Sequence, residues 1–209
     1  MSHQKKIIEA GVPLCQAKQA LILLHGRGGS AEDILSLTQY LPVTDFYIAA
    51  PQATNNTWYP LSFLAPTSQN EPWLNSALHI VKEVGTHMQQ NGIAPECIYI
   101  LGFSQGACLA MEFAAHHAQR YGGVIALTGG LIGDTLNPSR YSGNFSGTPI
   151  LMTNGSNDPH VPLIRSEQSK QQLEMMDARV ELLVYPNRPH TILQAELQAA
   201  ARYLSPQMT

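Results

Sequence analysis

Short apolar runs alternate along this chain with longer segments in which apolar residues recur at helical spacing. The apolar runs predict strands at residues 7–11, 20–24, 46–50, 97–101, 123–127, 150–153 and 180–185. The segments between them predict helices at residues 31–40, 72–90, 107–115, 163–176 and 191–204. Strands that alternate with helices indicate a mostly parallel sheet with helices on both faces. We therefore expect a single α/β domain over residues 1–209.

Composition and charge indicate a globular protein without affinity for polyanions. Apolar residues make up 44% of the 209 residues and charged residues only 13%, which fits one sizeable core better than a disordered chain. The net charge of −3 gives no electrostatic basis for binding nucleic acid or an anionic membrane. No apolar run reaches the length of a membrane span, and none follows the polar start at residues 1–6. We therefore expect neither a membrane anchor nor a signal peptide.

The cysteines give no sign of an oxidising compartment. The chain has three cysteines, an odd number, at irregular spacing: Cys15, Cys97 and Cys108. This pattern argues against a disulfide framework and against a zinc site. We expect a cytoplasmic protein.

One predicted helix carries a stripe that two interpretations fit. His79, Glu83 and His87 recur every four residues, and such a stripe could hold a metal ion. Lys82 and Thr86 lie on the same side of the helix, opposite its apolar side. We therefore expect a solvated helix face, and no metal or other cofactor.

The stretch Gly-Phe-Ser-Gln-Gly at residues 102–106 lies between a predicted strand and a predicted helix. In that context G-x-S-x-G is typical of a sharp turn that lifts a nucleophilic serine above a sheet. Glycines two residues before and after Ser104 leave room where a Cβ would collide with neighbouring backbone. The alternative is an ordinary strand-to-helix turn.

A serine hydroxyl needs a base within hydrogen-bond reach, and that base needs an orienting group. Polar loops follow four predicted strands, at residues 25–29, 104, 153–159 and 187–190, so these loops should meet at one edge of the sheet. His190 is the preferred base because it follows Ser104 in the last of these loops. His160 is its rival. Asp158, which lies between nucleophile and base in sequence, is the expected acid.

A tetrahedral intermediate also needs hydrogen-bond donors for its oxyanion. We expect one donor to be the backbone N–H of Gln105, the residue after the serine. The other should come from the glycine-rich loop at residues 25–29, with the N–H of Arg27 preferred and that of Gly28 next. The Arg27 side chain could reach a substrate carboxylate or lie in solvent.

The walls of an acyl pocket should come from the long loops at the same edge. Trp58 and Tyr59 could cover the pocket or could pin their loop to the core. Cys108, one helical turn after the serine, is expected to pack in the core. Further candidate pocket residues are Gly28, Leu61, Phe63, Leu131 and Val161.

Several motifs together resemble the small carboxylesterase/phospholipase family of α/β-hydrolases, which includes acyl-protein thioesterases. They are Leu-Leu-His-Gly-Arg-Gly-Gly at 23–29, Ala-Pro at 50–51, Trp-Tyr at 58–59, the motif at 102–106, Asp-Pro-His-Val-Pro at 158–162 and Pro-His at 189–190. The resemblance implies the α/β-hydrolase fold without an inserted cap domain. It also implies a triad of Ser104, Asp158 and His190, with Arg27 and Gln105 at the oxyanion hole.

The chain departs from the thioesterase members at the expected mouth of the site. It has Arg27-Gly28-Gly29 where they usually carry Leu-Gly-Asp, Tyr59-Pro60 where they carry Phe-Asp, and Pro189 where they carry glycine. These differences argue against specificity for palmitoylated proteins.

We therefore expect a serine hydrolase that cleaves small-molecule carboxylic esters through an acyl-enzyme. Without a cap domain the acyl pocket should be shallow, which favours short or medium acyl groups. Two alternatives stay open: an acyl-protein thioesterase or lysophospholipase that acts on long acyl chains, and a non-catalytic binding module on the same fold. A homodimer also stays open.

Overall fold

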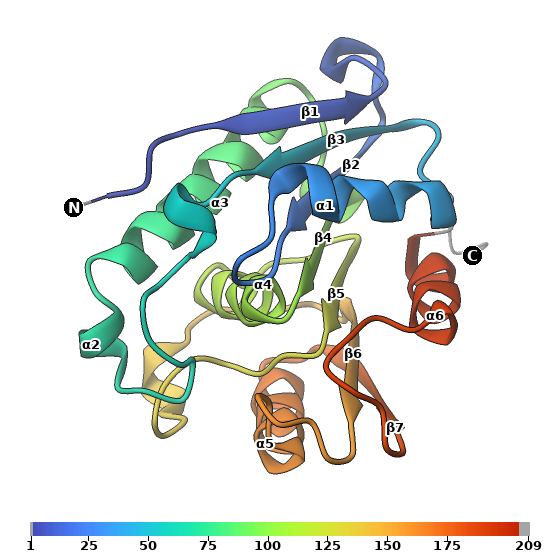
Figure 1. Cartoon of the computed structure of the whole chain (residues 1–209). Coiled ribbons are helices and arrows are strands. Elements are labelled where there is room, and N and C mark those ends of the chain that lie inside the picture. Colours follow the sequence, from blue (N-terminus) through green and yellow to red (C-terminus); the bar gives the residue numbers. More distant parts are fainter. Residues whose placement is uncertain (1, 205–209) are drawn as a thin grey trace.

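The protein is described by a computed structural model that covers residues 2–204 (Figure 1). Within these residues one sheet contains β1 (Ile7–Gly11), β2 (Gln19–Leu24), β3 (Phe46–Pro51), β4 (Ile98–Phe103), β5 (Gly123–Leu127), β6 (Pro149–Gly155) and β7 (Arg179–Tyr185). The strand order is β1-β3-β2-β4-β5-β6-β7, and every pair is parallel except the edge pair of β1 with β3. The predicted domain bounds of 1–209 stay a prediction, because residue 1 and residues 205–209 lie outside the described part.

Helices connect the strands and cover the sheet. The α-helices are α1 (Ala31–Leu35), α2 (Thr67–Asn70), α3 (Trp73–Gln90), α4 (Gln105–His116), α5 (Leu163–Met175) and α6 (Gln194–Leu204). Short 3₁₀ turns lie at Leu14–Gln16, Ser36–Tyr40, Thr54–Asn56, Pro95–Cys97 and Pro138–Arg140. The mostly parallel sheet with helices on both faces confirms the predicted fold class.

The structure corrects two of the predicted helices. The helix expected at residues 31–40 is α at 31–35 only and continues as a 3₁₀ turn. The helix expected from residue 191 begins at Gln194. The Glu196 carboxylate accepts the N–H of Leu193 at 2.8 Å, as an acidic side chain at the third helical position does for the capping residue. This bond fixes the start of α6 and leaves residues 191–193 in the loop.

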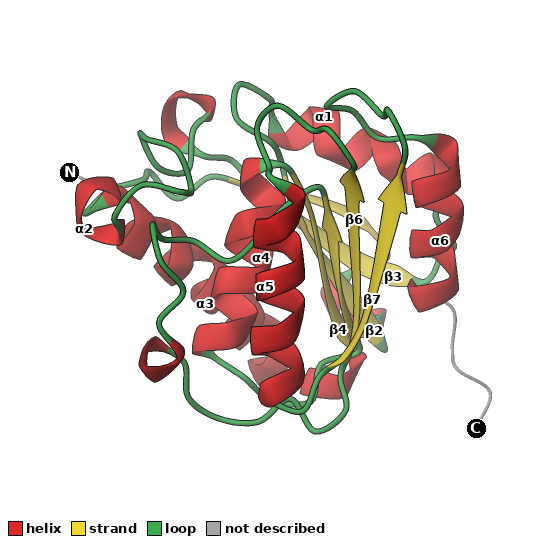
Figure 2. Cartoon of the chain, turned by 90° about the horizontal axis from the view of Figure 1, so that it is seen from below, coloured by secondary structure: helices red, strands yellow, loops and turns green. Residues whose placement is uncertain are grey.

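Each face of the sheet has its own hydrophobic core, and β2 contributes to both. Leu21 and Leu23 belong to the core that α1 and α6 cover, whereas Ile22 and Leu24 belong to the core that α3, α4 and α5 cover. Figure 2 shows these two helix layers on opposite sides of the sheet. The alternation along one strand is the period of two that a sheet buried on both faces requires.

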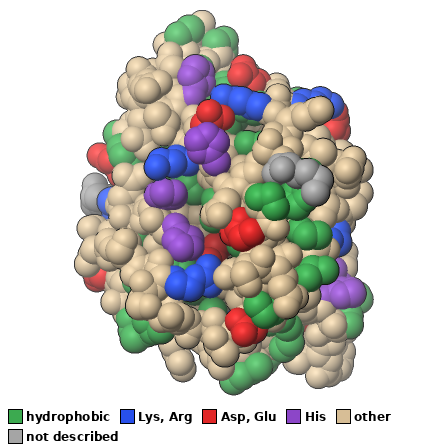
Figure 3. All heavy atoms as spheres, turned by 90° about the vertical axis from the view of Figure 1, so that its left-hand side faces the viewer, with side chains coloured by type: hydrophobic (Ala, Val, Ile, Leu, Met, Phe, Trp, Pro, Cys, Tyr) green, Lys and Arg blue, Asp and Glu red, His purple; other side chains and the backbone are tan. Residues whose placement is uncertain are grey.

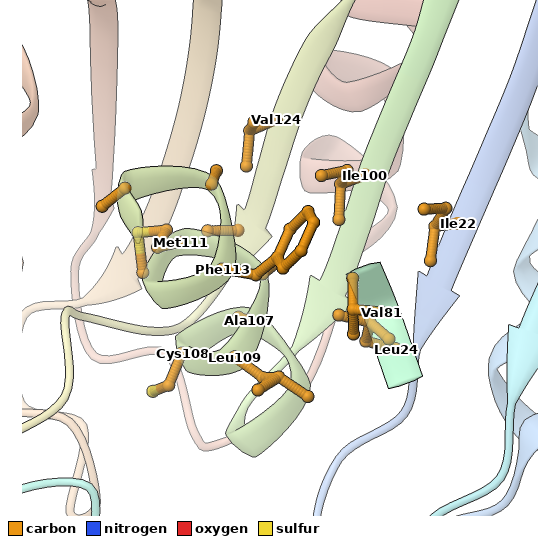
Figure 4. Close-up of a cluster of buried hydrophobic side chains, with 14 of the residues drawn as sticks. Ile22, Leu24, Val81, Ile100, Ala107, Cys108, Leu109, Met111, Phe113 and Val124 are labelled. Atoms are coloured by element: carbon orange, nitrogen blue, oxygen red, sulfur yellow. The ribbon is translucent and has the colours of Figure 1, made fainter. Parts of the chain in front are cut away.

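Helix α4 lies at the centre of the larger core and is buried along almost its whole length. In Figure 4 the Phe113 ring of α4 points toward Ile100 of β4, with Val81 of α3 and Leu24 of β2 nearby. A helix that is apolar nearly all round is stable only when it is covered on every side. The sheet, α3 and the 131–145 loop supply residues to this cover.

No helix within residues 2–204 is both long and apolar enough to cross a membrane.

Two glycines allow α4 to approach the strands closely. A Cβ on Gly106 would lie 2.1 Å from the Leu24 carbonyl oxygen, and a Cβ on Gly102 would lie 2.2 Å from the Gly106 carbonyl oxygen. Both contacts are with backbone, so a larger residue would have to move the helix away from the sheet.

We expect Gly106→Ala to lower the free energy of unfolding by about 1–3 kcal/mol or more, because the added methyl overlaps the backbone of β2. Urea denaturation measures this change. Gly85→Ala in α3 is the matched control: a Cβ there meets no atom within 4 Å, so helix propensity alone should act and favour alanine. Equal stability of the two variants would contradict the close approach.

Candidate active site

Ser104 occupies a strained turn between β4 and α4. Its backbone has φ 53° and ψ −116°, a conformation that non-glycine residues seldom adopt. The Ser104 N–H donates to the Leu127 carbonyl at 3.0 Å, and the Ser104 carbonyl accepts from the N–H of Cys108 at 3.0 Å. These bonds tie the turn to β5 on one side and to α4 on the other.

The structure brings together the three side chains that the sequence singled out. His190 Nε2 lies 2.8 Å from Ser104 Oγ. His190 Nδ1 lies 2.9 Å from one Asp158 oxygen and 3.1 Å from the other. A carboxylate can only accept, so the imidazole proton lies on Nδ1 and Nε2 is left to accept the serine hydroxyl. The hydrogen bonds therefore run in the order serine, histidine, carboxylate.

Asp158 is held in its charged form by several donors. Its carboxylate accepts the backbone N–H groups of His160 at 2.9 Å and Val161 at 3.0 Å, in addition to the His190 ring. Burial alone would raise the pKa of Asp158, but these hydrogen bonds outweigh burial and hold its pKa below the ordinary value. The carboxylate is thus ready to stabilise an imidazolium.

His160, the rival base, lies beside the cluster. The His160 ring is edge-on to the His190 ring, with the ring centroids 4.7 Å apart. It is His190, through Nε2, that lies within hydrogen-bond distance of Ser104 Oγ. The Phe103 ring lies 5.4 Å from the His190 ring. His160 and Phe103 therefore both pack against the His190 ring.

The two N–H groups expected at the oxyanion hole are available. Among the described residues the structure records no partner for the backbone N–H of Arg27 or of Gln105. The N–H of Gly28, the second choice, donates to the Asn56 carbonyl at 2.7 Å. Gly28 is therefore engaged in holding its loop, whereas the N–H of Arg27 has no partner within the described residues.

The side chains of Arg27 and Gln105 both hold the loop that follows β3, which the sequence did not predict. Arg27 Nη1 donates to the carbonyl of Pro60 at 2.9 Å, and Nη2 donates to those of Tyr59 at 2.9 Å and Leu61 at 2.6 Å. Gln105 Nε2 donates to the Tyr59 carbonyl at 2.8 Å, and its Oε1 accepts the Trp58 N–H at 2.9 Å. Main-chain partners more than thirty residues away leave no pattern in the sequence.

A cavity of about 380 Å³ opens beside Ser104. Of the pocket residues expected from the sequence, Tyr59, Leu61, Phe63 and Val161 line it. The full lining is Arg27, Tyr59, Pro60, Leu61, Ser62, Phe63, Ser104, Gln105, Cys108, His160, Val161 and His190.

Trp58, Leu131 and Gly28 lie outside this lining. Trp58 is fully buried and its indole N–H donates to the His25 carbonyl at 2.8 Å, so it pins its loop to the core. Leu131 is also fully buried, with its N–H bonded to Ser169 Oγ at 2.9 Å.

Cys108 packs in the core as expected, but it also reaches the cavity. The Cys108 N–H donates to the Ser104 carbonyl, so Cys108 lies one helical turn after the serine, and the spacing of four residues is the signal for its position. Burial raises the pKa of the Cys108 thiol to about 12. The group is therefore a neutral thiol at neutral pH and not a competing nucleophile.

The stripe on α3 is part of a mixed, solvated surface. Glu83 lies 3.6 Å from His79 and 3.2 Å from Lys5, and all three side chains are well exposed. Figure 3 looks onto this side of the molecule and shows histidine, basic and acidic side chains interspersed. Within residues 2–204, no group of three or more His, Cys, Asp or Glu residues is arranged to hold a metal ion.

Comparison with known families places the chain in one of them. The family described as Phospholipase/Carboxylesterase matches residues 5–208 of the chain. The protein belongs to this family. The match confirms the resemblance that the sequence motifs indicated.

Relatives within the phospholipase/carboxylesterase family cover nearly the whole chain. Acyl-protein thioesterase 1 of Saccharomyces cerevisiae is 29% identical over 90% of this chain and 92% of the yeast protein. The probable carboxylesterase SOBER1-like of Arabidopsis thaliana is 25% identical over 92% of this chain and 80% of its own length. A crystal structure of a phospholipase/carboxylesterase from Dyadobacter fermentans is 50% identical, with a TM-score of 0.96 over 98% of both chains.

In this family member His25 ties the loop after β2 to the loop after β3. The His25 ring is fully buried; its Nδ1–H donates to the Gly26 carbonyl at 2.8 Å, and its Nε2 accepts the Ala53 N–H at 3.1 Å. Protonation of Nε2 would remove that acceptor. Burial lowers the pKa of His25.

We expect His25 to make the protein less stable in mild acid. Its pKa is lower in the folded than in the unfolded chain, so the unfolded chain takes up the proton first as the pH falls below about 6.5. The free energy of unfolding should therefore fall from about pH 7 to pH 5, and less steeply in His25→Gln, because glutamine at position 25 does not titrate. Urea denaturation at several pH values measures both slopes, and equal slopes would exclude this role.

Proposed function

We propose that this protein is a serine hydrolase that cleaves small-molecule carboxylic esters with short to medium acyl groups. The observation that carries the proposal is the continuous hydrogen-bonded order of Ser104, His190 and Asp158 at the rim of a cavity. Membership of the phospholipase/carboxylesterase family supports the same reaction class. We further propose a cytoplasmic location.

The proposed reaction has two stages. His190 Nε2 takes the hydroxyl proton as Ser104 Oγ attacks the ester carbonyl, and the N–H groups of Arg27 and Gln105 bind the oxyanion. The C–O bond to the alcohol then breaks, His190 returns the proton to the leaving oxygen, and an acyl-serine remains. Water attacks the acyl-serine by the same steps and releases the acid. Asp158 keeps the Nδ1 proton in place and stabilises the imidazolium.

The cavity supports the proposed acyl size. Its volume of about 380 Å³ lies near the lower end of the range of roughly 300–1,000 Å³ for small-molecule sites. Its lining contains no Asp or Glu side chain, and Tyr59, Leu61, Phe63 and Val161 supply apolar surface. A short acyl chain or a compact leaving group fits these walls.

A thioesterase or lysophospholipase acting on long acyl chains is the second candidate. The observation in its favour is the similarity to the yeast protein named acyl-protein thioesterase 1. A long chain would extend beyond the cavity over the exposed Leu61 side chain. The non-catalytic binding module is the third candidate.

Hydrolysis of p-nitrophenyl esters of increasing acyl length tests the proposal. Wild type should be most active on short or medium chains, and Ser104→Ala should lower kcat on the order of 10⁴-fold or more because the nucleophile is lost. Ser139→Ala, an exposed serine in a 3₁₀ turn, is the matched control and should leave the rate unchanged.

The outcomes separate the three candidates. Higher kcat/KM on long-chain esters or thioesters would favour the second candidate. An unchanged rate in Ser104→Ala would refute the nucleophile. If folded wild type is inactive on every ester and thioester, both enzyme candidates are excluded and the non-catalytic binding module is the candidate that stays.

A further inference from the structure

One guanidinium group holds three consecutive backbone carbonyls at the mouth of the cavity. Arg27 donates to the carbonyls of Tyr59, Pro60 and Leu61, and all three residues line the cavity. No ion pair between Arg27 and a carboxylate is found within residues 2–204. The carbonyls are therefore the hydrogen-bond acceptors that fix this side chain, and the guanidinium carbon also lies 6.0 Å from the centroid of the Tyr59 ring. Hydrogen bonds from a charged donor are stronger than neutral ones.

The segment 59–61 depends on side chains for its position. It belongs to no helix or strand, and the Leu61 side chain is 43% exposed. Besides Arg27, its backbone is held by Gln105 at the Tyr59 carbonyl and by Asn70 Oδ1, which accepts the Leu61 N–H at 2.9 Å. Loss of the three Arg27 bonds would leave the Pro60 carbonyl without a recorded protein partner in the described structure.

Arg27 and Gln105 each contribute to the site in two ways, through the backbone N–H and through the side chain. Arg27 and Gln105 both line the cavity that contains Ser104, and within the described residues their backbone N–H groups have no hydrogen-bond partner, while their side chains hold the Tyr59 carbonyl in the cavity wall. The position of the wall is thus tied, through single residues, to the position of the oxyanion donors. A substitution that keeps the Arg27 N–H but removes its guanidinium separates the two roles.

We propose that Arg27 is a positioning residue whose side chain fixes the 59–61 wall and so sets which acyl groups the enzyme accepts. This inference rests on the proposed esterase function. Removal of the guanidinium should let the wall move, so that acyl groups of different length bind with similar affinity. Since the substitution keeps the backbone N–H of residue 27, the proposed oxyanion donor, the loss should appear mainly in KM rather than in kcat.

Arg27→Met tests the proposal, because methionine fills part of the same space without any donor. With p-nitrophenyl esters, kcat/KM for the preferred acyl length should fall about tenfold or more, chiefly through KM, and the preference among acyl lengths should flatten. Arg27→Lys keeps one charged donor group and should restore part of the preference. Arg202→Met, an exposed arginine on α6, is the matched control and should behave as wild type.

Amide hydrogen exchange provides a measurement that does not depend on activity. In Arg27→Met the peptide covering residues 57–63 should exchange faster than in wild type, whereas peptides from β4 and α4 should not change. This change would support the role of Arg27 in holding the wall even if no active ester were found. The failure of the esterase proposal is therefore distinguishable from the failure of this inference.

Two results would overturn the inference. One is an active wild type whose acyl preference and exchange in residues 57–63 are unchanged in Arg27→Met. The other is a loss confined to esters that carry a carboxylate, with unchanged exchange, because the guanidinium would then contact substrate directly. Thermal unfolding of each variant shows whether the protein remains folded at the assay temperature.

Discussion

The close approach of α4 to β2 and β4 is the contact on which the site depends. Gly106 lies against the Leu24 carbonyl, and Gly102 lies against the Gly106 carbonyl. Only at this distance can the chain turn at Ser104 with positive φ and still pair β4 with both neighbouring strands. The turn presents the free N–H groups at the start of α4 on the same side as the loop at residues 25–29. The positions of Ser104 and of the Gln105 N–H, the proposed nucleophile and oxyanion donor, therefore depend on the same close contact between helix and sheet.

Much of this arrangement could be predicted from the sequence because it is encoded locally. Gly102 and Gly106 around Ser104 identify the turn, and the order of the chain singles out His190, which the structure places next to the serine, as the candidate base. The period of two in β2 predicts a sheet covered on both faces. Helix ends were less predictable, since the start of α6 depends on which backbone N–H Glu196 accepts.

The parts that could not be predicted depend on contacts between a side chain and a distant backbone. Trp58 fits a pocket wall as well as a buried anchor until its indole N–H is seen to donate to His25. Arg27 in a glycine-rich loop gives no sign that its partners are carbonyls in residues 59–61. A carbonyl belongs to every residue type, so such a contact leaves no signature in composition or spacing.

These contacts follow one rule around the carboxyl edge of the sheet: each long loop is held by a charged side chain that bonds its backbone. Arg27 holds residues 59–61, and Arg165 donates to the carbonyls of Leu131, Gly133 and Asp134. Buried Glu112 accepts the Ile132 N–H and binds the Arg140 side chain.

The loop that carries His190 is held in the same way. Arg188 donates to the carbonyls of Pro189 and Thr191, on either side of His190, and its Nε lies 3.6 Å from the Glu196 carboxylate, with both side chains fully buried. A buried charge of this kind contributes little net stability, but it is costly to leave unpaired, so it restricts the loop to the conformation that satisfies it. In a fold whose described residues insert no cap domain over the site, this restriction is what keeps the mouth of the cavity in shape.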